Sequence, residues 1–103
     1  MEKLKGFQRK HLRGVAHSLK PVVLIGQKGN TEAVLKAIEE ALEVHELIKI
    51  KFIDCKEKEQ KNEIILDLEI RTGSEMVGMI GHTAIFYRKH TDPDKHKIIL
   101  PEK

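Results

Sequence analysis

The sequence is poor in aromatic residues, cysteine and long apolar runs, and each shortage argues against a class of protein. Aromatic side chains make up 4% of the 103 residues and tryptophan is absent, so the stacking platform of many single-strand nucleic-acid binders is not evident. The single cysteine, Cys55, cannot form an internal disulfide and is expected to be an inert thiol. No apolar run approaches the roughly 20 residues that span a bilayer, and the first residues lack the apolar segment of a secretory signal. We therefore expect a cytoplasmic protein that does not enter the membrane.

The sequence also lacks the spacings that are typical of metal, nucleotide and cofactor sites. Its six histidines form no His-x-x-x-His pair, and one cysteine cannot give Cys-x-x-Cys. Neither the Gly-x-x-x-x-Gly-Lys-Thr pattern nor the Gly-x-Gly-x-x-Gly pattern occurs. We therefore predict no enzyme, no cofactor and no metal site.

Charge, by contrast, is abundant and unevenly distributed. Charged residues make up 34% and apolar residues 40%, a balance typical of one globular domain with a single core. Residues 1–31 hold seven Lys or Arg against one Glu, whereas residues 32–46 hold one Lys against five Glu. This segregation favours a polyanionic partner more than the net charge of +3 suggests, although a solvated helix face gives the same pattern.

Hydrophobic periodicity predicts the element order α-β-α-β-α-β-β. Helices are expected over 5–18 and over 31–44, the second capped by Asn30 or Thr31, with its glutamates facing water. The continuous apolar run 21–25 predicts a buried parallel strand, and the alternating run 47–53 predicts another. Two apolar runs, 76–80 and 84–88, predict a hairpin, and the extended end 98–101 can dock on the sheet edge.

The segment from Lys56 to Thr72 fits two periods. Leu66, Leu68 and Ile70 alternate as in a strand, while the apolar spacing from Ile64 onward also fits a helix. Helix formers at the start and Thr72-Gly73 at the end favour a helix, which leaves apolar side chains within 64–70 on more than one side, where a partner could contact them. The elements together predict an α/β fold with two right-handed crossovers and a final antiparallel strand.

A Gly-x-x-Gly loop, Gly26-Gln27-Lys28-Gly29, separates the first predicted strand from the second helix. Glycine allows close backbone approach and positive φ, and the free N–H groups that open the next helix attract anions. Lys28 adds a mobile positive charge. The loop is therefore a candidate phosphate cradle, with an ordinary βα turn as the alternative.

Two further groups of cations can add to such a surface. Arg9, Lys10 and Arg13 form the polar face of the first predicted helix. Lys49 and Lys51 alternate with apolar residues on the strand 47–53, so they project from its other side. If these groups converge with the loop, they form one basic surface suited to a nucleic-acid backbone.

Several separated motifs resemble one known family. The chain is similar to the CRM domain, the RNA-binding module of chloroplast splicing factors and of prokaryotic ribosome maturation proteins, and in particular to the stand-alone YhbY-like form. The resemblance covers about Leu4 to Arg88 and rests on the segments Gln8–Arg13, Ala16–Val23, Ile25–Gly29, Glu46–Lys49, Ile80–Gly81 and Phe86–Arg88.

The resemblance implies a two-layer α/β sandwich similar to the C-terminal domain of translation initiation factor three, with a four-stranded mixed sheet and the last strand inserted antiparallel. It implies RNA binding through the Gly-x-x-Gly loop, comparable to the loop of KH domains, with Arg88 among the candidate contacts. In KH domains the loop joins two helices, whereas here it follows a strand, so individual KH contacts are not transferred. The implied partners are ribosomal RNA or precursors of the large ribosomal subunit. The sequence does not determine the oligomeric state, for which we favour a monomer.

A protein-interaction adaptor is the alternative function. The second predicted helix is acidic, with Glu32, Glu39, Glu40 and Glu43, and it could contact ribosomal proteins. Binding of this kind is compatible with RNA binding at another surface.

Overall fold

A computed structural model describes residues 3–54 and 57–101; Cys55, expected to be an inert thiol, lies outside the described residues. The predicted order α-β-α-β-α-β-β is confirmed, and the ambiguous segment that ends at Thr72 is a helix. The elements are α1 (Gly6–Ala16), β1 (Pro21–Ile25), α2 (Glu32–His45), β2 (Leu47–Phe52), α3 (Lys58–Thr72), β3 (Glu75–Ile80), β4 (Thr83–Tyr87) and the short 3-10 helix η1 (Pro93–Lys95).

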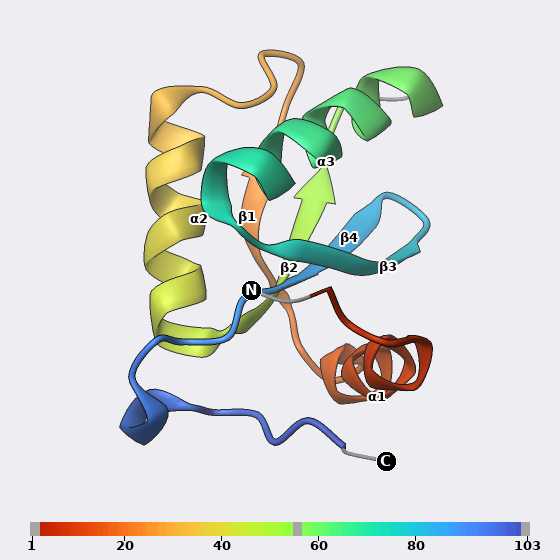
Figure 1. The fold of residues 1–103 in the computed structure, drawn as a ribbon. Helices are drawn as coiled ribbons and strands as arrows, with labels where there is room; N and C mark the ends of the chain where they lie inside the picture. Colours follow the sequence, from red (N-terminus) through yellow and green to blue (C-terminus); the bar gives the residue numbers. More distant parts are fainter. Residues whose placement is uncertain (1–2, 55–56, 102–103) are drawn as a thin grey trace.

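The four strands form one mixed sheet in the order β1-β2-β4-β3 (Figure 1). Strands β1 and β2 are parallel, while β4 is antiparallel to both of its neighbours. β4 therefore lies between β2 and β3, which confirms the inserted antiparallel strand that the resemblance implies. Because β4 lies between β2 and β3, the crossover through α3 joins two strands that are not neighbours in the sheet.

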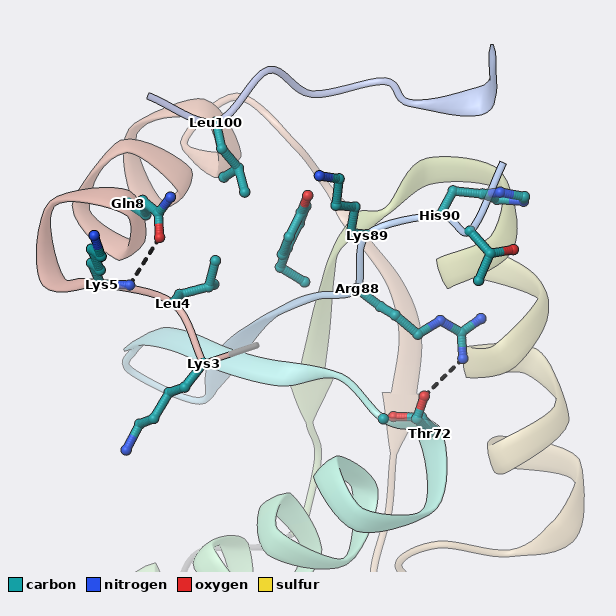
Figure 2. A pocket seen from close by; sticks show the side chains of 12 residues that line it. Lys3, Leu4, Lys5, Gln8, Thr72, Arg88, Lys89, His90 and Leu100 are labelled. Atoms are coloured by element: carbon teal, nitrogen blue, oxygen red, sulfur yellow. Dashed lines mark hydrogen bonds between the residues drawn. The ribbon is translucent and has the colours of Figure 1, made fainter. Parts of the chain in front are cut away.

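Helices lie on both faces of the sheet. α2 and α3 pack on one face and form the expected sandwich with it, and α1 lies against the other face (Figure 1). The smaller of two apolar clusters lies under α1 and includes Leu4, Leu12 and Val77, with Ile98 and Leu100 packed on it. Leu4 and Leu100 face the same space from the two ends of the chain (Figure 2). The sequence predicts that the C-terminal segment docks on the sheet edge. This prediction is wrong, because the segment docks beside α1.

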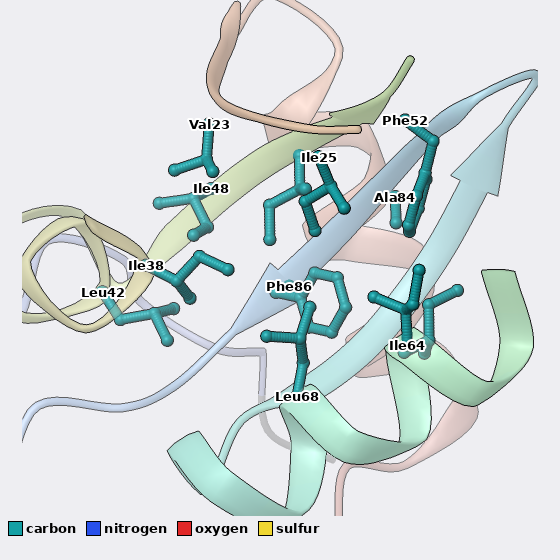
Figure 3. Close-up of a cluster of buried hydrophobic side chains, with 12 residues drawn as sticks. Val23, Ile25, Ile38, Leu42, Ile48, Phe52, Ile64, Leu68, Ala84 and Phe86 are labelled. Atoms are coloured by element: carbon teal, nitrogen blue, oxygen red, sulfur yellow. The ribbon is translucent and has the colours of Figure 1, made fainter. Parts of the chain in front are cut away.

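The larger cluster lies between the sheet and the pair α2 and α3 (Figure 3). Strand residues alternate into it as the period of a strand requires. Its buried members are Val23, Ile25, Ile38, Leu42, Ile48, Ile50, Phe52, Ile64, Ile65, Leu68, Ala84 and Phe86.

β1 is the one strand whose burial was predicted wrongly. Val23 and Ile25 are buried, but Val22 is 49% and Leu24 is 55% exposed. The strand lies at the edge of the sheet, and α1 covers only part of the opposite face, so alternate side chains of the apolar run remain in water.

Glu46 connects α2 to β2 and holds the C-terminal segment. It is completely buried and adopts a positive φ of 61°. Its carboxylate accepts backbone N–H bonds from His90 at 2.7 Å, from Lys97, and from Ile98 at 3.2 Å. A buried carboxylate therefore replaces sheet pairing as the device that fixes the end of the chain.

Candidate nucleic-acid interface

The Gly-x-x-Gly loop forms a tight turn at the C-terminal end of β1. The Gly29 N–H donates to the Gly26 carbonyl at 3.0 Å, and the Thr31 N–H donates to the Gly29 carbonyl at 3.1 Å. Gly29 has a φ of +66°, a conformation that side chains other than glycine rarely adopt. Gln27 and Lys28 occupy the exposed centre of the turn. Of the two candidate caps, Thr31 caps α2: its hydroxyl accepts the Val34 N–H at 3.2 Å.

Asn30 has a different role, which the sequence did not reveal. Its side-chain amide donates to the Ile64 carbonyl at 3.1 Å and to Asp67 at 3.0 Å, so it holds the loop against α3. Arg71 also donates to Asp67, at 2.8 Å. The hydrogen bonds from Arg71 and then from Asn30 hold the pKa of Asp67 below its usual value. The loop is thus fixed by contacts with residues more than thirty positions away.

An open hollow of about 360 Å³ lies between the loop and α3. Lys28 lies on its loop side, and the carboxylates of Glu63 and Asp67 lie on its α3 side. A phosphate approaching from α3 meets negative charge, whereas one approaching Lys28 from outside the hollow does not. The electrostatics therefore favour an anion on the outer side of the turn.

Two of the three cationic side chains of α1 make contacts within the fold. Arg9 donates to the Leu4 carbonyl at 2.6 Å and lies 3.4 Å from a Glu75 carboxylate oxygen. Arg13 donates to the Val77 carbonyl at 2.9 Å. Lys10 is exposed and makes no hydrogen bond or ion pair with a residue that the structure describes. Two of the three side chains thus contribute to holding α1 and the preceding segment against β3.

The two lysines of β2 also differ. The Lys49 ammonium donates to the Leu19 carbonyl at 2.9 Å and to the His17 carbonyl at 3.4 Å, where it binds the chain just after α1. Lys51 is exposed and, within 3–54 and 57–101, has no hydrogen-bond or ion-pair partner. It pairs with Leu24 in the sheet register, next to the loop.

Arg88 lies at the other end of the sheet. One of its nitrogens contacts both carboxylate oxygens of Glu39, at 2.9 and 2.8 Å, and the Thr72 carbonyl at 2.8 Å. Its second terminal nitrogen donates to Glu43 at 3.0 Å. The sequence predicted that these glutamates face water; they are about half exposed, but both are paired. Two of the four carboxylates proposed for a protein partner therefore already hold Arg88.

The structure places the candidate residues in three locations. Lys28 and Lys51 lie at the sheet end where β1 and β2 finish. The α1 cations lie on the face opposite α2 and α3, and Lys49 reaches the chain just after α1; Arg88 lies at the far end of β4. The ends of the six-residue β2 are separated by about 17 Å, taking 3.3–3.4 Å per residue, so Arg88 and the loop cannot contact one phosphate.

Comparison with known proteins identifies the family. The CRS1 / YhbY (CRM) domain model matches residues 4–88. The chain belongs to this family. Within the described residues of this CRM domain, no helix is long and apolar enough to cross a membrane, and no three His, Cys, Asp or Glu residues gather closely enough to hold a metal ion.

The relatives of this CRM domain are similar over most of their length. A protein of Haemophilus influenzae named RNA-binding protein is 42% identical over 103 residues, which is 100% of both chains. A probable RNA-binding protein of Pseudomonas aeruginosa, PA4753, is 37% identical over 86% of this chain and 85% of its own. The solution structure of SAV1595 from Staphylococcus aureus, described as a candidate RNA-binding protein, has 34% identity and a TM-score of 0.81, and the match covers 96% of this chain and 100% of that one.

Proposed function

We propose that this CRM domain binds RNA and acts in the assembly of the large ribosomal subunit. RNA binding is supported by the family and by the names of the relatives. The role in assembly rests on the resemblance to stand-alone YhbY-like proteins. The domain serves as a binding module in the cytoplasm and carries no catalytic step.

The observation that carries the proposal is the position of Lys28. Its side chain is exposed at the centre of a turn that is braced on α3 and that precedes the N-terminus of α2. A phosphate at this place meets a mobile ammonium group, the backbone of Gly26–Gly29 and the positive end of the helix dipole. Gln27 adds a side-chain donor on the same turn.

The remaining candidate contacts follow from which cations are already used. Lys10 and Lys51 are exposed and, among the residues that the structure describes, have no partner, so their donors are available for phosphate. Arg9, Arg13 and Lys49 each bind a protein carbonyl but keep further N–H donors, so they can contact RNA without leaving their places. Arg88 would take part only where RNA extends to the far end of the sheet.

Salt titrations of the wild type and of Lys28→Ala test the proposal. Affinity for structured RNA should fall steeply with salt, and the variant should bind more weakly with a log–log salt slope reduced by about one. Lys36→Ala is the matched control, because Lys36 is an exposed lysine on the acidic helix α2. Salt-independent binding by the wild type, or a Lys28 variant that behaves like the Lys36 control, would count against the loop as a phosphate site.

A further inference from the structure

A cavity of about 600 Å³ lies at the end of the sheet opposite the Gly-x-x-Gly loop. Its walls come from the segment before α1, the turn after α3, the chain that follows β4 and the C-terminal segment (Figure 2). Among the ten candidate RNA contacts, only Arg88 lines it. The volume lies within the range of roughly 300–1,000 Å³ that is typical of sites for small ligands.

Apolar and hydrogen-bonding groups line the cavity together. Leu4 and Leu100 point into the same space from opposite sides (Figure 2). Gln8 lies beside them, and its side-chain oxygen is held by the Lys5 N–H at 2.9 Å, so this edge of the cavity is fixed. The two leucines give this part of the cavity apolar walls.

The charges around the cavity have one sign. Lys5 and Lys89 stand on opposite sides of it, and Lys3 lies at its rim (Figure 2). No aspartate or glutamate is among the described residues that line it, and none of these three ammonium groups pairs with a carboxylate within 3–54 and 57–101. Arg88 and His90 also line it, but Arg88 is paired with Glu39 and Glu43, and the His90 Nε2 lies 2.9 Å from a Glu43 carboxylate oxygen. The three lysines would attract an anion to the cavity.

Tyr87 adds a hydroxyl to the lining. The residue as a whole is 1% exposed, and its side chain makes no hydrogen bond with any residue that the structure describes. Burial, and then the negative charge of Glu46, raise the pKa of Tyr87 to about 12, so the hydroxyl keeps its proton at neutral pH. It can both donate and accept a hydrogen bond, so a ligand in the cavity can use it in either role.

We propose that this cavity binds one nucleotide, with its base against the apolar wall that includes Leu4 and Leu100 and its phosphate at Lys89. A nucleoside monophosphate combines a flat ring, hydrogen-bonding edges and an anion, which are the three chemistries of the walls. An unpaired nucleotide of RNA and a free nucleotide share this chemistry. The RNA source rests on the function proposed above; the free-nucleotide source does not.

Amide chemical shifts of the full chain, titrated with GMP, guanosine and inorganic phosphate, test the site. GMP should shift the amides of Leu4, Lys5, Tyr87 and Lys89 and reach saturation, and it should bind at least about tenfold more tightly than either fragment, because each fragment meets only half of the walls. Phosphate that binds as tightly as GMP would overturn the proposal, as would GMP shifts confined to the Gly-x-x-Gly loop.

Three variants sharpen the test. Lys89→Ala should weaken GMP binding about tenfold by removing one charge-assisted contact, and Tyr87→Phe should weaken it several-fold while the ring remains in the core. Lys95→Ala is the matched control, because Lys95 is exposed and does not line the cavity. Equal GMP affinities for the Lys89 and Lys95 variants would contradict the assignment.

Two hairpin RNAs distinguish the sources, one fully paired and one with a single unpaired nucleotide. If Lys89→Ala weakens binding of the second hairpin alone, the nucleotide comes from RNA; if GMP binds the cavity and the hairpins bind equally, it is a free nucleotide. GMP binding to the cavity without any RNA binding would contradict the proposed function and support the site. RNA binding that depends on Lys28, with no GMP shifts at the cavity, would contradict the site alone.

Discussion

Replacing Glu46 should detach the C-terminal segment from the rest of the domain. The Glu46 carboxylate accepts three backbone N–H bonds, two on one oxygen from Lys97 and Ile98 and one on the other from His90. Hydrogen bonds to a charged acceptor contribute about 1.5–3 kcal/mol each, but the released donors lie near the surface, where water can replace the carboxylate. Counting about 1 kcal/mol for each donor, Glu46→Ala should lower the free energy of unfolding by about 3 kcal/mol.

Two companion variants separate the side chain from the backbone. Glu46→Gln keeps one oxygen acceptor and should lose only about 1–2 kcal/mol. Glu46→Gly lacks the carboxylate as Glu46→Ala does, but glycine tolerates the φ of 61° at this position, so it should be about 1 kcal/mol more stable than the alanine variant. The expected order of stability is therefore wild type, Gln, Gly, Ala.

Urea unfolding, analysed with the same m-value for all variants, measures these differences in the free energy of unfolding. Amide hydrogen exchange shows which residues lose protection. The N–H groups of His90, Lys97 and Ile98 should lose protection in Glu46→Ala. An alanine variant within about 0.5 kcal/mol of the wild type would refute the role of the carboxylate. Equal stabilities of the alanine and glycine variants would refute the part assigned to backbone conformation.

Three further predictions test other parts of the structure. Tyr87 is the only tyrosine, so tyrosinate absorbance of the folded chain should titrate near pH 12. Because the folded pKa of Tyr87 is raised, its contribution to stability is complete below pH 10 and is lost as the pH rises toward 12. A tyrosinate titration near pH 10 in the folded chain would contradict the burial of Tyr87. Gly78→Ala places a methyl group against the Arg13 side chain and should displace that side chain from the Val77 carbonyl, which lowers the free energy of unfolding by about 1 kcal/mol. In an Arg13→Ala background, a double-mutant cycle should find no such loss. Asn30→Ala should loosen the Gly-x-x-Gly loop, weakening RNA binding about threefold and stability by about 1 kcal/mol; RNA titration and urea unfolding measure both, and unchanged RNA affinity would contradict the brace.

The order of elements could be predicted from the sequence because it depends on local patterns. Helix formers and the Thr72-Gly73 stop resolved the ambiguous segment, and Gly73 does end α3 with a positive φ of 67°. The burial of β1 could not be predicted, because an apolar run does not reveal which strand lies at an edge. The inserted position of β4 came from the family resemblance and not from periodicity.

The turn at the candidate site could be predicted from the sequence, but the contacts that surround it could not. The turn at Gly26–Gly29 could be read from the chain, but the brace from Asn30 to Ile64 depends on the packing of α3. In the same way, a basic helix face shows positive charge but not that Arg13 binds a carbonyl 64 positions away. Glu46 was overlooked because its three donors come from a segment that begins 44 positions later.

Crosslinking of the protein to RNA in growing cells, with both partners mapped, tests the central claim most directly. We expect crosslinked RNA to be enriched in large-subunit ribosomal RNA and its precursors, and crosslinked peptides to include residues 21–36 with the Gly-x-x-Gly loop. Lys28→Ala should reduce that peptide's crosslinks while Lys36→Ala does not. Crosslinks without enrichment of ribosomal RNA, or a loop absent from the crosslinked peptides, would contradict it.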